Sequence, residues 1–260
     1  MKKRTLFPIY LIFILVIIYI PILLVIIYSF NQGRLTSVWS GFSLRWYREL
    51  FKDRSMFEAL ANSLVLAFLA SFFSGAIGTL GAAGMARRAA RTAGKTIEYL
   101  SILPMMTPEI ILGMTFLSFF TFLALPAGMT TLVIAHTAFC VPYVYLLVKA
   151  RLAGLDKSYI EAARIMGAAD TRAFYDITLP LVLPAVISGM LISFAMSFDD
   201  VIISVFVAGV HTNTLPMKIY SQIKTGVTPK TNAMCTLIFV FTIIICAASA
   251  LFARKNRYKK

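Results

Sequence analysis

Six long apolar stretches divide the sequence and constrain its fold. They occupy residues 8–29, 60–86, 97–123, 129–149, 181–207 and 232–253. A helix needs about 20 largely apolar residues to cross a bilayer, and it satisfies its backbone hydrogen bonds within its own segment. Since 59% of the residues are hydrophobic and only 14% are charged, an ordinary soluble domain is excluded. We predict an all-α polytopic membrane protein in which residues 1–260 form a single transmembrane domain of six helices.

The positive charges indicate how these helices are oriented. Most of the 25 Lys and Arg residues cluster at the two termini and in the segments 87–95 and 149–172. Short loops rich in Lys and Arg stay on the cytoplasmic side of a membrane, so both termini are predicted to be cytoplasmic. A nucleic-acid partner is not expected, because the basic residues lie in short caps between apolar helices instead of on a soluble basic face.

The sequence predicts neither a metal site nor an enzyme. Its three cysteines and two histidines lack the spacing of metal ligands, and no nucleophile, base and orienting group converge within a span. Gly94-Lys95-Thr96 resembles the end of a phosphate-binding loop, but Ala89 replaces the first glycine of that motif. We expect the chain to bind no cofactor, so that any ATP and Mg²⁺ are bound by a partner.

A row of glycines marks the second apolar stretch, at Gly75, Gly78, Gly81 and Gly84. Small residues let helix backbones approach closely in lipid. The row predicts a packing seam between helices. A close backbone along a transport path is the alternative, and the sequence does not separate the two.

Three acidic residues, Glu109, Asp199 and Asp200, fall inside predicted spans. A charged Asp at the centre of a span costs roughly 2.5 to 3.5 kcal/mol, so these side chains should face a cavity or a partner. Consecutive helical positions differ by about 100°, so only one of Asp199 and Asp200 is expected to face the bundle axis. Either could instead cap a helix, and the choice between them stays open.

Glu109 is predicted near the middle of the bilayer, and it follows Pro104 and Pro108 in the sequence. Each proline removes one backbone hydrogen bond, which would leave the carbonyls of Leu100 and Pro104 available near the carboxylate. Oxygens grouped in this way suit a cation. The alternative is a kinked helix in which Glu109 bonds to a neighbouring helix.

Residues 150–180 form the longest predicted cytoplasmic loop. The alanines of Glu161-Ala162-Ala163 favour a helix, and Gly167 can adopt the left-handed conformation that ends one. Asp170 is expected to cap a second short helix, and Pro180 and Pro184 to mark the turn into the fifth span. Ile160, Ala163 and Gly167 share one small, partly apolar face, which suits a groove on a partner.

The loop as a whole has the pattern E-A-A-x3-G-x9-I-x-L-P, from Glu161 to Pro180. It resembles the EAA loop of permeases from ATP-binding-cassette (ABC) importers. The resemblance implies the type I importer permease (MetI-like) fold. It also implies that Glu161, Ala162, Ala163 and Gly167 belong to a coupling helix that docks on an ATPase subunit, which hydrolyses the ATP.

Further segments are similar to the PotC-type permeases of spermidine/putrescine importers. They are Ser29–Asn31 with Trp46-Tyr47, Met106–Ile110, Ser197–Val201, Leu215–Ser221 and Gly226–Pro229. The resemblance implies a bacterial inner-membrane protein that works with an ATPase dimer, a sister permease and an extracytoplasmic polyamine-binding protein. Glu109 stands where this family has Asp, so the acidic side chain at this position is longer than in the family. The hypothesis is that Glu109 and one of Asp199 and Asp200 line the path of the polyamine.

Two other functions remain in competition at this point. One is an importer permease of the same superfamily for another small solute, although three acids within spans argue against an anion. The other is an ion-coupled secondary transporter, in which the acids would be proton or sodium sites. The two halves of the chain show no convincing internal match, and that mechanism gives no reason for the EAA loop.

Overall fold

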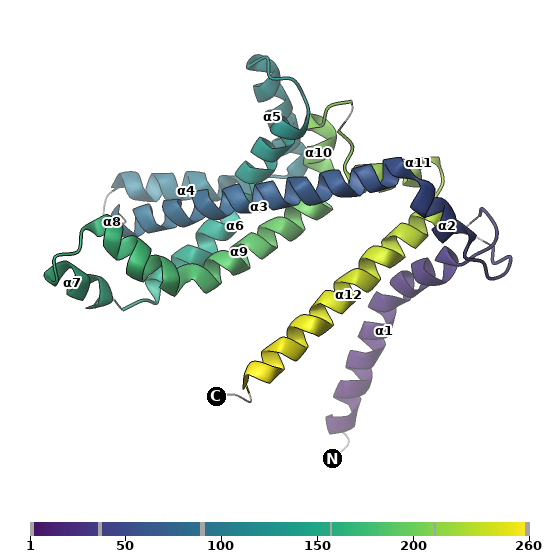
Figure 1. Cartoon of the computed structure of the whole chain (residues 1–260), viewed down its shortest axis with the longest axis horizontal. Coiled ribbons are helices and arrows are strands. Elements are labelled where there is room, and N and C mark those ends of the chain that lie inside the picture. The colour runs from purple at the N-terminus through teal and green to yellow at the C-terminus, as the bar shows by residue number, and fades with distance from the viewer. Residues whose placement is uncertain (1–2, 36–37, 89–91, 157, 211, 258–260) are drawn as a thin grey trace. The chain divides into compact units, whose positions relative to one another are not determined.

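The computed structural model describes residues 3–35, 38–88, 92–156, 158–210 and 212–257. Every named element in these ranges is a helix, as Figure 1 shows, and residues 31 and 42 form an isolated bridge. The chain divides into two compact units. The terminal unit comprises residues 1–57 and 219–260, and the central unit comprises residues 58–218.

The terminal unit is built on α1 (Lys3–Ser29), α2 (Arg45–Lys52) and α12 (Pro229–Arg257). Helices α1 and α12 lie side by side, and α2 packs against α12 (Figure 1). Trp46 on α2 is buried, and its indole N–H donates to the carbonyl of Asn31 at 2.7 Å. The side chain of Asn31 in turn bonds to the backbone of the loop that follows α1. The loop is therefore anchored to α2.

An ion pair joins the end of α2 to the start of α12. The ammonium of Lys230 donates to Asp53 Oδ2 at 2.6 Å and holds the pKa of that carboxyl at about 2, below its usual value of 3.8. Because the folded-state pKa is the lower one, the pair stabilises the fold above about pH 4, and this contribution is lost as the pH falls towards 2. Lys230→Met should therefore cost about 1 kcal/mol at neutral pH.

The measurement is the thermal unfolding midpoint of the purified protein as a function of pH. The difference between wild type and Lys230→Met is expected to shrink as the pH falls from about 4 to about 2. Lys52→Met removes an exposed cation from α2 and serves as the control. A Lys230→Met difference that does not change with pH would show that the pair contributes no stability.

The central unit contains the helices on which the acidic residues lie. Helix α3 (Arg54–Arg88) enters it at residue 58, and α11 (Leu215–Thr225) leaves it after residue 218. Between them are α4 (Thr92–Met106), α5 (Glu109–Phe122), α6 (Met129–Ala153), α7 (Ser158–Ile165), α8 (Asp170–Ala173), the π-helix η1 (Phe174–Thr178), α9 (Leu179–Asp199) and α10 (Ile202–Val207).

Helix α6 lies in the core of the central unit, against α9 along much of its length (Figure 1). Glycines allow this close packing. A Cβ at Gly78 of α3 would lie 2.8 Å from Val144 Cβ, and a Cβ at Gly189 of α9 would lie 2.9 Å from Val144 Cα. Both distances are too short for real atoms, so α6 is held between two backbones at Val144.

The predicted glycine seam is thus confirmed at Gly78, and also at Gly75, where a Cβ would meet the Met190 side chain of α9 at 2.7 Å. The prediction was wrong for Gly84, which has no such neighbour within 4 Å. The seam holds α3 against α6 and α9 over part of its length.

The described residues confirm the all-helical class and only part of the predicted set of spans. Four helices are long and apolar enough to cross a membrane: Tyr10–Ser29, Arg54–Ala86, Met129–Ala153 and Asp170–Asp199. The predicted third span is broken into Thr96–Met106 and Glu109–Phe122, which meet at 109° and count as a fifth candidate if they form one span. A sixth span is not confirmed within the described residues, where only the shorter apolar segment Pro229–Ile244 matches it.

Both departures from continuous helices have a local cause. Pro108 has no N–H to continue α4 and disfavours helical geometry in Thr107, so the chain becomes extended at Pro108 (φ −55°, ψ 134°) before α5 begins. The predicted fifth span also ends early, at Asp199, because Asp200 is extended (φ −67°, ψ 131°) and α10 starts as a separate helix. The breaks lie next to the acidic residues.

Candidate functional site

The three acidic residues predicted within spans all lie at breaks between helices. Glu109 is the first residue of α5 and is partly exposed. Asp199 is the last residue of α9 and is exposed, whereas Asp200 lies between α9 and α10 and is buried. The carboxylates of Asp200 and Asp199 both repel that of Glu109. The structure therefore brings together in space three acids that are as much as 91 positions apart in the sequence.

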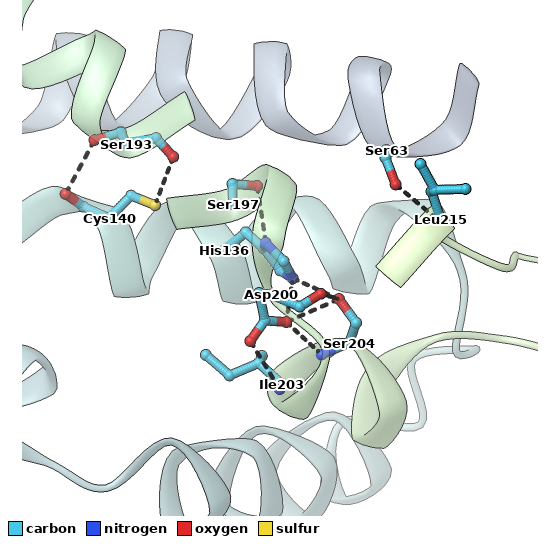
Figure 2. Close-up of polar contacts among 9 residues, drawn as sticks. All are labelled: Ser63, His136, Cys140, Ser193, Ser197, Asp200, Ile203, Ser204 and Leu215. Carbon is cyan, nitrogen blue, oxygen red and sulfur yellow. Dashed lines mark hydrogen bonds and ion pairs between the residues drawn. The ribbon is translucent and has the colours of Figure 1, made fainter. Parts of the chain in front are cut away.

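Asp200 is held by donors from its own chain (Figure 2). Its Oδ1 accepts the N–H of Ile203 at 3.2 Å, and its Oδ2 accepts both the N–H and the hydroxyl of Ser204 at 2.9 Å. Only 3% of its side-chain surface is exposed. Asp200 therefore caps the first turn of α10, where free backbone N–H groups need an acceptor.

His136 completes this cluster from α6. Its ring is fully buried, with Nδ1 2.9 Å from Ser197 Oγ, and Nε2 3.1 Å from Ser204 Oγ and 3.4 Å from Asp200 Oδ2 (Figure 2). One imidazole thus bonds to α9 and to α10 and lies next to the carboxylate in the break between them. Sequence reasoning missed this residue because its partners are 61 and 68 positions away.

The two adjacent acids differ in their surroundings. Asp200 has a capping role, and Asp199 is the one whose side chain is exposed. The expected group of free carbonyls is partly wrong, since the carbonyl of Pro104 accepts the N–H of Thr107 at 3.3 Å. Thr107 is drawn back into the last turn of α4 because Pro108 leaves it no onward helix. Of the three acids, Glu109 is partly exposed and Asp199 is exposed, whereas Asp200 is buried.

Helices α6 and α9 are joined by further polar contacts near this cluster. Ser193 and Cys140 exchange weak hydrogen bonds with each other's backbone carbonyls at 3.5 Å (Figure 2). Thr131 at the start of α6 donates to the carbonyl of Val207 at the end of α10. The two ends of α10 are therefore fixed to α6. Among the described residues, no group of three or more His, Cys, Asp or Glu side chains is arranged to hold a metal ion.

The loop of residues 150–180 has the predicted first helix, α7, and this helix ends where glycine was expected to end it. Gly167 has φ +84°, its N–H donates to the carbonyl of Arg164, and the N–H of Ala168 donates to that of Ala163. This pair of bonds is the Schellman arrangement. Glu161 and Ala162 are exposed on α7, as is Gly167 after it, whereas Ala163 is buried.

Three details of the loop differ from the prediction. The N-cap of α8 is Ala169 and not Asp170, and Asp170 Oδ1 accepts a hydrogen bond from Arg164 at 3.0 Å. No turn occurs at Pro180 or Pro184, because the wider π-turn η1 leads directly into α9 and Pro180 lies in the first turn, where its missing N–H is tolerated.

The third difference concerns the face that was expected to meet a partner. Ala163 is buried and Ile160 is partly buried, since α7 packs against α8 and η1. The apolar side chains that project from the end of α7 are Ile165 and Met166, which are 87% and 88% exposed. A partner of this loop would therefore meet Ile165 and Met166.

Solved structures with the same fold are ABC importer components. The chain matches a bacterial ABC transporter involved in the import of the acidic polysaccharide alginate with a TM-score of 0.75 and 14% identity, over 96% of this chain and 95% of that one. It matches the MetNI methionine ABC transporter with a TM-score of 0.63 and 19% identity, over 76% of this chain and 94% of that one. The fold is therefore that of an ABC importer permease.

The sequence identifies the family. Residues 75–258 match the family of binding-protein-dependent transport system inner membrane components, and the chain belongs to that family. It is 38% identical to the spermidine/putrescine transport system permease protein PotC of Haemophilus influenzae over 93% of each chain. It is also 40% identical to the putrescine transport system permease protein PotI of Escherichia coli, over 85% of this chain and 81% of PotI.

Proposed function

We propose that this chain is a permease subunit of an ATP-driven importer and forms the path of spermidine or putrescine across the cytoplasmic membrane. The observation that carries the proposal is that Glu109 and Asp199 lie at two helix breaks in the central unit, close enough for their charges to interact. The names of its relatives PotC and PotI support the same cargo. A polyamine that loses its water needs oxygens of opposite charge, bound weakly enough to be released.

The three acids have different parts in this proposal. Glu109 and Asp199 contact the cargo, because their side chains are accessible. Asp200 contributes negative charge and does not touch the cargo, because it is buried and its oxygens accept hydrogen bonds from α10. The Glu side chain is longer than that of Asp, so the carboxylate at position 109 reaches further into the path.

The proposal includes partners of the kind found in ABC importers. An ATPase dimer binds ATP and Mg²⁺ and contacts Glu161, Ala162 and Gly167 in the cytoplasm, together with the exposed Ile165 and Met166, while the buried Ala163 packs within the loop. A sister permease completes the path, and an extracytoplasmic binding protein delivers the polyamine. The protein lies in the inner membrane with both termini in the cytoplasm, as the distribution of Lys and Arg indicates.

The test is uptake of radiolabelled spermidine and putrescine by sealed vesicles that contain the complete importer. Uptake is expected to need ATP and the binding protein, and to survive collapse of the proton gradient. Uptake that survives ATP depletion but not gradient collapse would instead support the ion-coupled alternative. Exclusion of both polyamines with uptake of another solute would refute the cargo and leave the importer class intact.

Gly167→Ala tests the coupling loop. An alanine held at φ +84° costs roughly 1 to 2 kcal/mol, so the end of α7 should shift and displace Ile165 and Met166. We expect polyamine uptake per ATP hydrolysed to fall several-fold. Gly226→Ala, at another exposed glycine with positive φ (+111°), imposes the same strain outside the loop and should leave this ratio unchanged. An equal drop in both variants would contradict the coupling role.

A further inference from the structure

His136 is a buried polar residue that the proposed path does not use. Its ring has no exposed surface, so it cannot touch a cargo. Yet Ser197 and Ser204 both bond to it, and the carboxylate of Asp200 between them lies 3.4 Å from its Nε2 (Figure 2). A buried polar group keeps such partners because leaving them unpaired costs free energy.

The available donors and acceptors determine which atom donates in each hydrogen bond of the cluster. Ser204 has one hydroxyl hydrogen, and the 2.9 Å contact assigns it to Asp200 Oδ2. Ser204 Oγ must then accept from His136 Nε2, so the ring carries its proton on Nε2. In a neutral ring Nδ1 has a free lone pair and accepts the hydroxyl of Ser197. Every polar atom of the imidazole is then satisfied with the ring uncharged.

This chain of bonds sets the geometry of the break between α9 and α10. Ser197 belongs to the last turns of α9, and Ser204 to the first turns of α10. The ring fixes both to α6, which is itself held at Val144 by glycines of two other helices. Asp199 lies inside the segment that the ring fixes, and its exposed side chain depends on where α9 ends.

We propose that His136 is a positioning residue for transport: through Ser197, Ser204 and Asp200 it fixes the break that presents Asp199 to the cargo. This inference rests on the proposed function and adds to it a residue that acts without contact. If His136 instead only fills space, an apolar ring of similar size would replace it without loss. The two roles predict different results for the same substitutions.

The experiment measures polyamine uptake by vesicles that contain the complete importer, at a limiting polyamine concentration. The variants compared with the wild type are His136→Phe, His136→Gln, Asp199→Asn and the double variant His136→Phe/Asp199→Asn. His136→Phe is expected to lower uptake about tenfold, because Ser197 and Ser204 lose the partner that fixes them and the break between α9 and α10 is no longer held. His136→Gln keeps a donor and an acceptor and should retain more uptake. In the Asp199→Asn background, His136→Phe should have little further effect, because the charge that it positions is absent.

Two results would overturn the proposal. One is that the losses of uptake caused by His136→Phe and Asp199→Asn multiply in the double variant. The other is that His136→Phe takes up polyamine as fast as His136→Gln, or faster. Ser188→Ala is the control, since that exposed hydroxyl bonds only within α9, and it should match the wild type. Each rate is divided by the amount of assembled importer, so that a loss of folding does not count as a loss of positioning.

A second measurement is independent of the cargo. In the purified importer, the amides of Ile203 and Ser204 should exchange hydrogen faster in His136→Gln than in the wild type, because Asp200 is held less firmly. Unchanged exchange at both amides would overturn the positioning role. If the wild type takes up neither polyamine, the proposed function fails, while the exchange rates still decide whether His136 orders the break.

Discussion

Asp199→Asn should lower polyamine uptake by at least about tenfold while the importer still assembles. The side chain is exposed at the end of α9, so removing its charge leaves no buried group unpaired. A partly dehydrated ammonium group that loses one carboxylate loses on the order of 1.5 to 3 kcal/mol of interaction, which corresponds to a factor of ten or more. Glu109→Gln should act in the same direction for the same reason.

The measurement is uptake rate against polyamine concentration, with the amount of assembled importer determined by co-purification with the ATPase. Glu58→Gln removes an exposed acid that lies outside the group of three, and it controls for the general loss of negative charge. Normal uptake in both Asp199→Asn and Glu109→Gln, with normal assembly, would remove these residues from the path.

Asp200→Ala should have a different consequence: loss of the folded permease. The substitution leaves two backbone N–H groups of α10 and the hydroxyl of Ser204 without their acceptor. Breaking a buried network by removing its charged member typically costs about 3 to 5 kcal/mol, which is a large share of the stability of most domains. Little intact protein should therefore accumulate in the membrane.

The matched control is Asp199→Ala, which makes the same change one residue earlier at an exposed position. It should accumulate at nearly the wild-type level and unfold at nearly the wild-type temperature, measured in detergent by loss of the monodisperse chromatographic peak on heating. If the two alanine variants accumulate equally, the assignment of Asp200 to capping is wrong. The two alanine variants thus distinguish the role of Asp200 in stability from the role of Asp199 in transport.

Features set by local chemistry could be predicted from the sequence. Gly167 ends α7 in the left-handed conformation because that requirement belongs to one residue and its immediate neighbours. The importer class was also predictable, since the spacing from Glu161 to Pro180 is a local pattern. Pro108 was a local signal for the break before Glu109, but the uninterrupted apolar run at 97–123 suggested a continuous helix.

The role of Asp200 could not be predicted, because it depends on contacts between distant segments. A sequence does not show that His136, 64 positions earlier, will lie 3.4 Å from the Asp200 carboxylate. The capping bonds to Ile203 and Ser204 are local, but they form only if the chain leaves the helix after Asp199. That departure is favoured by packing of α10 against α5 and α6, and no pattern in the sequence encodes it.

The position of Glu109 at the start of α5 affects how long a cargo would stay bound. The first turn of a helix carries unpaired N–H groups and a partial positive charge of about half an elementary charge. These groups offset part of the negative charge of Glu109, which in an uninterrupted helix would act on the polyamine undiminished. The cation then binds in a shallower energy well, its residence time is shorter, and throughput is favoured over affinity. In the importer proposed above, tight capture of the scarce polyamine would fall to the soluble binding protein.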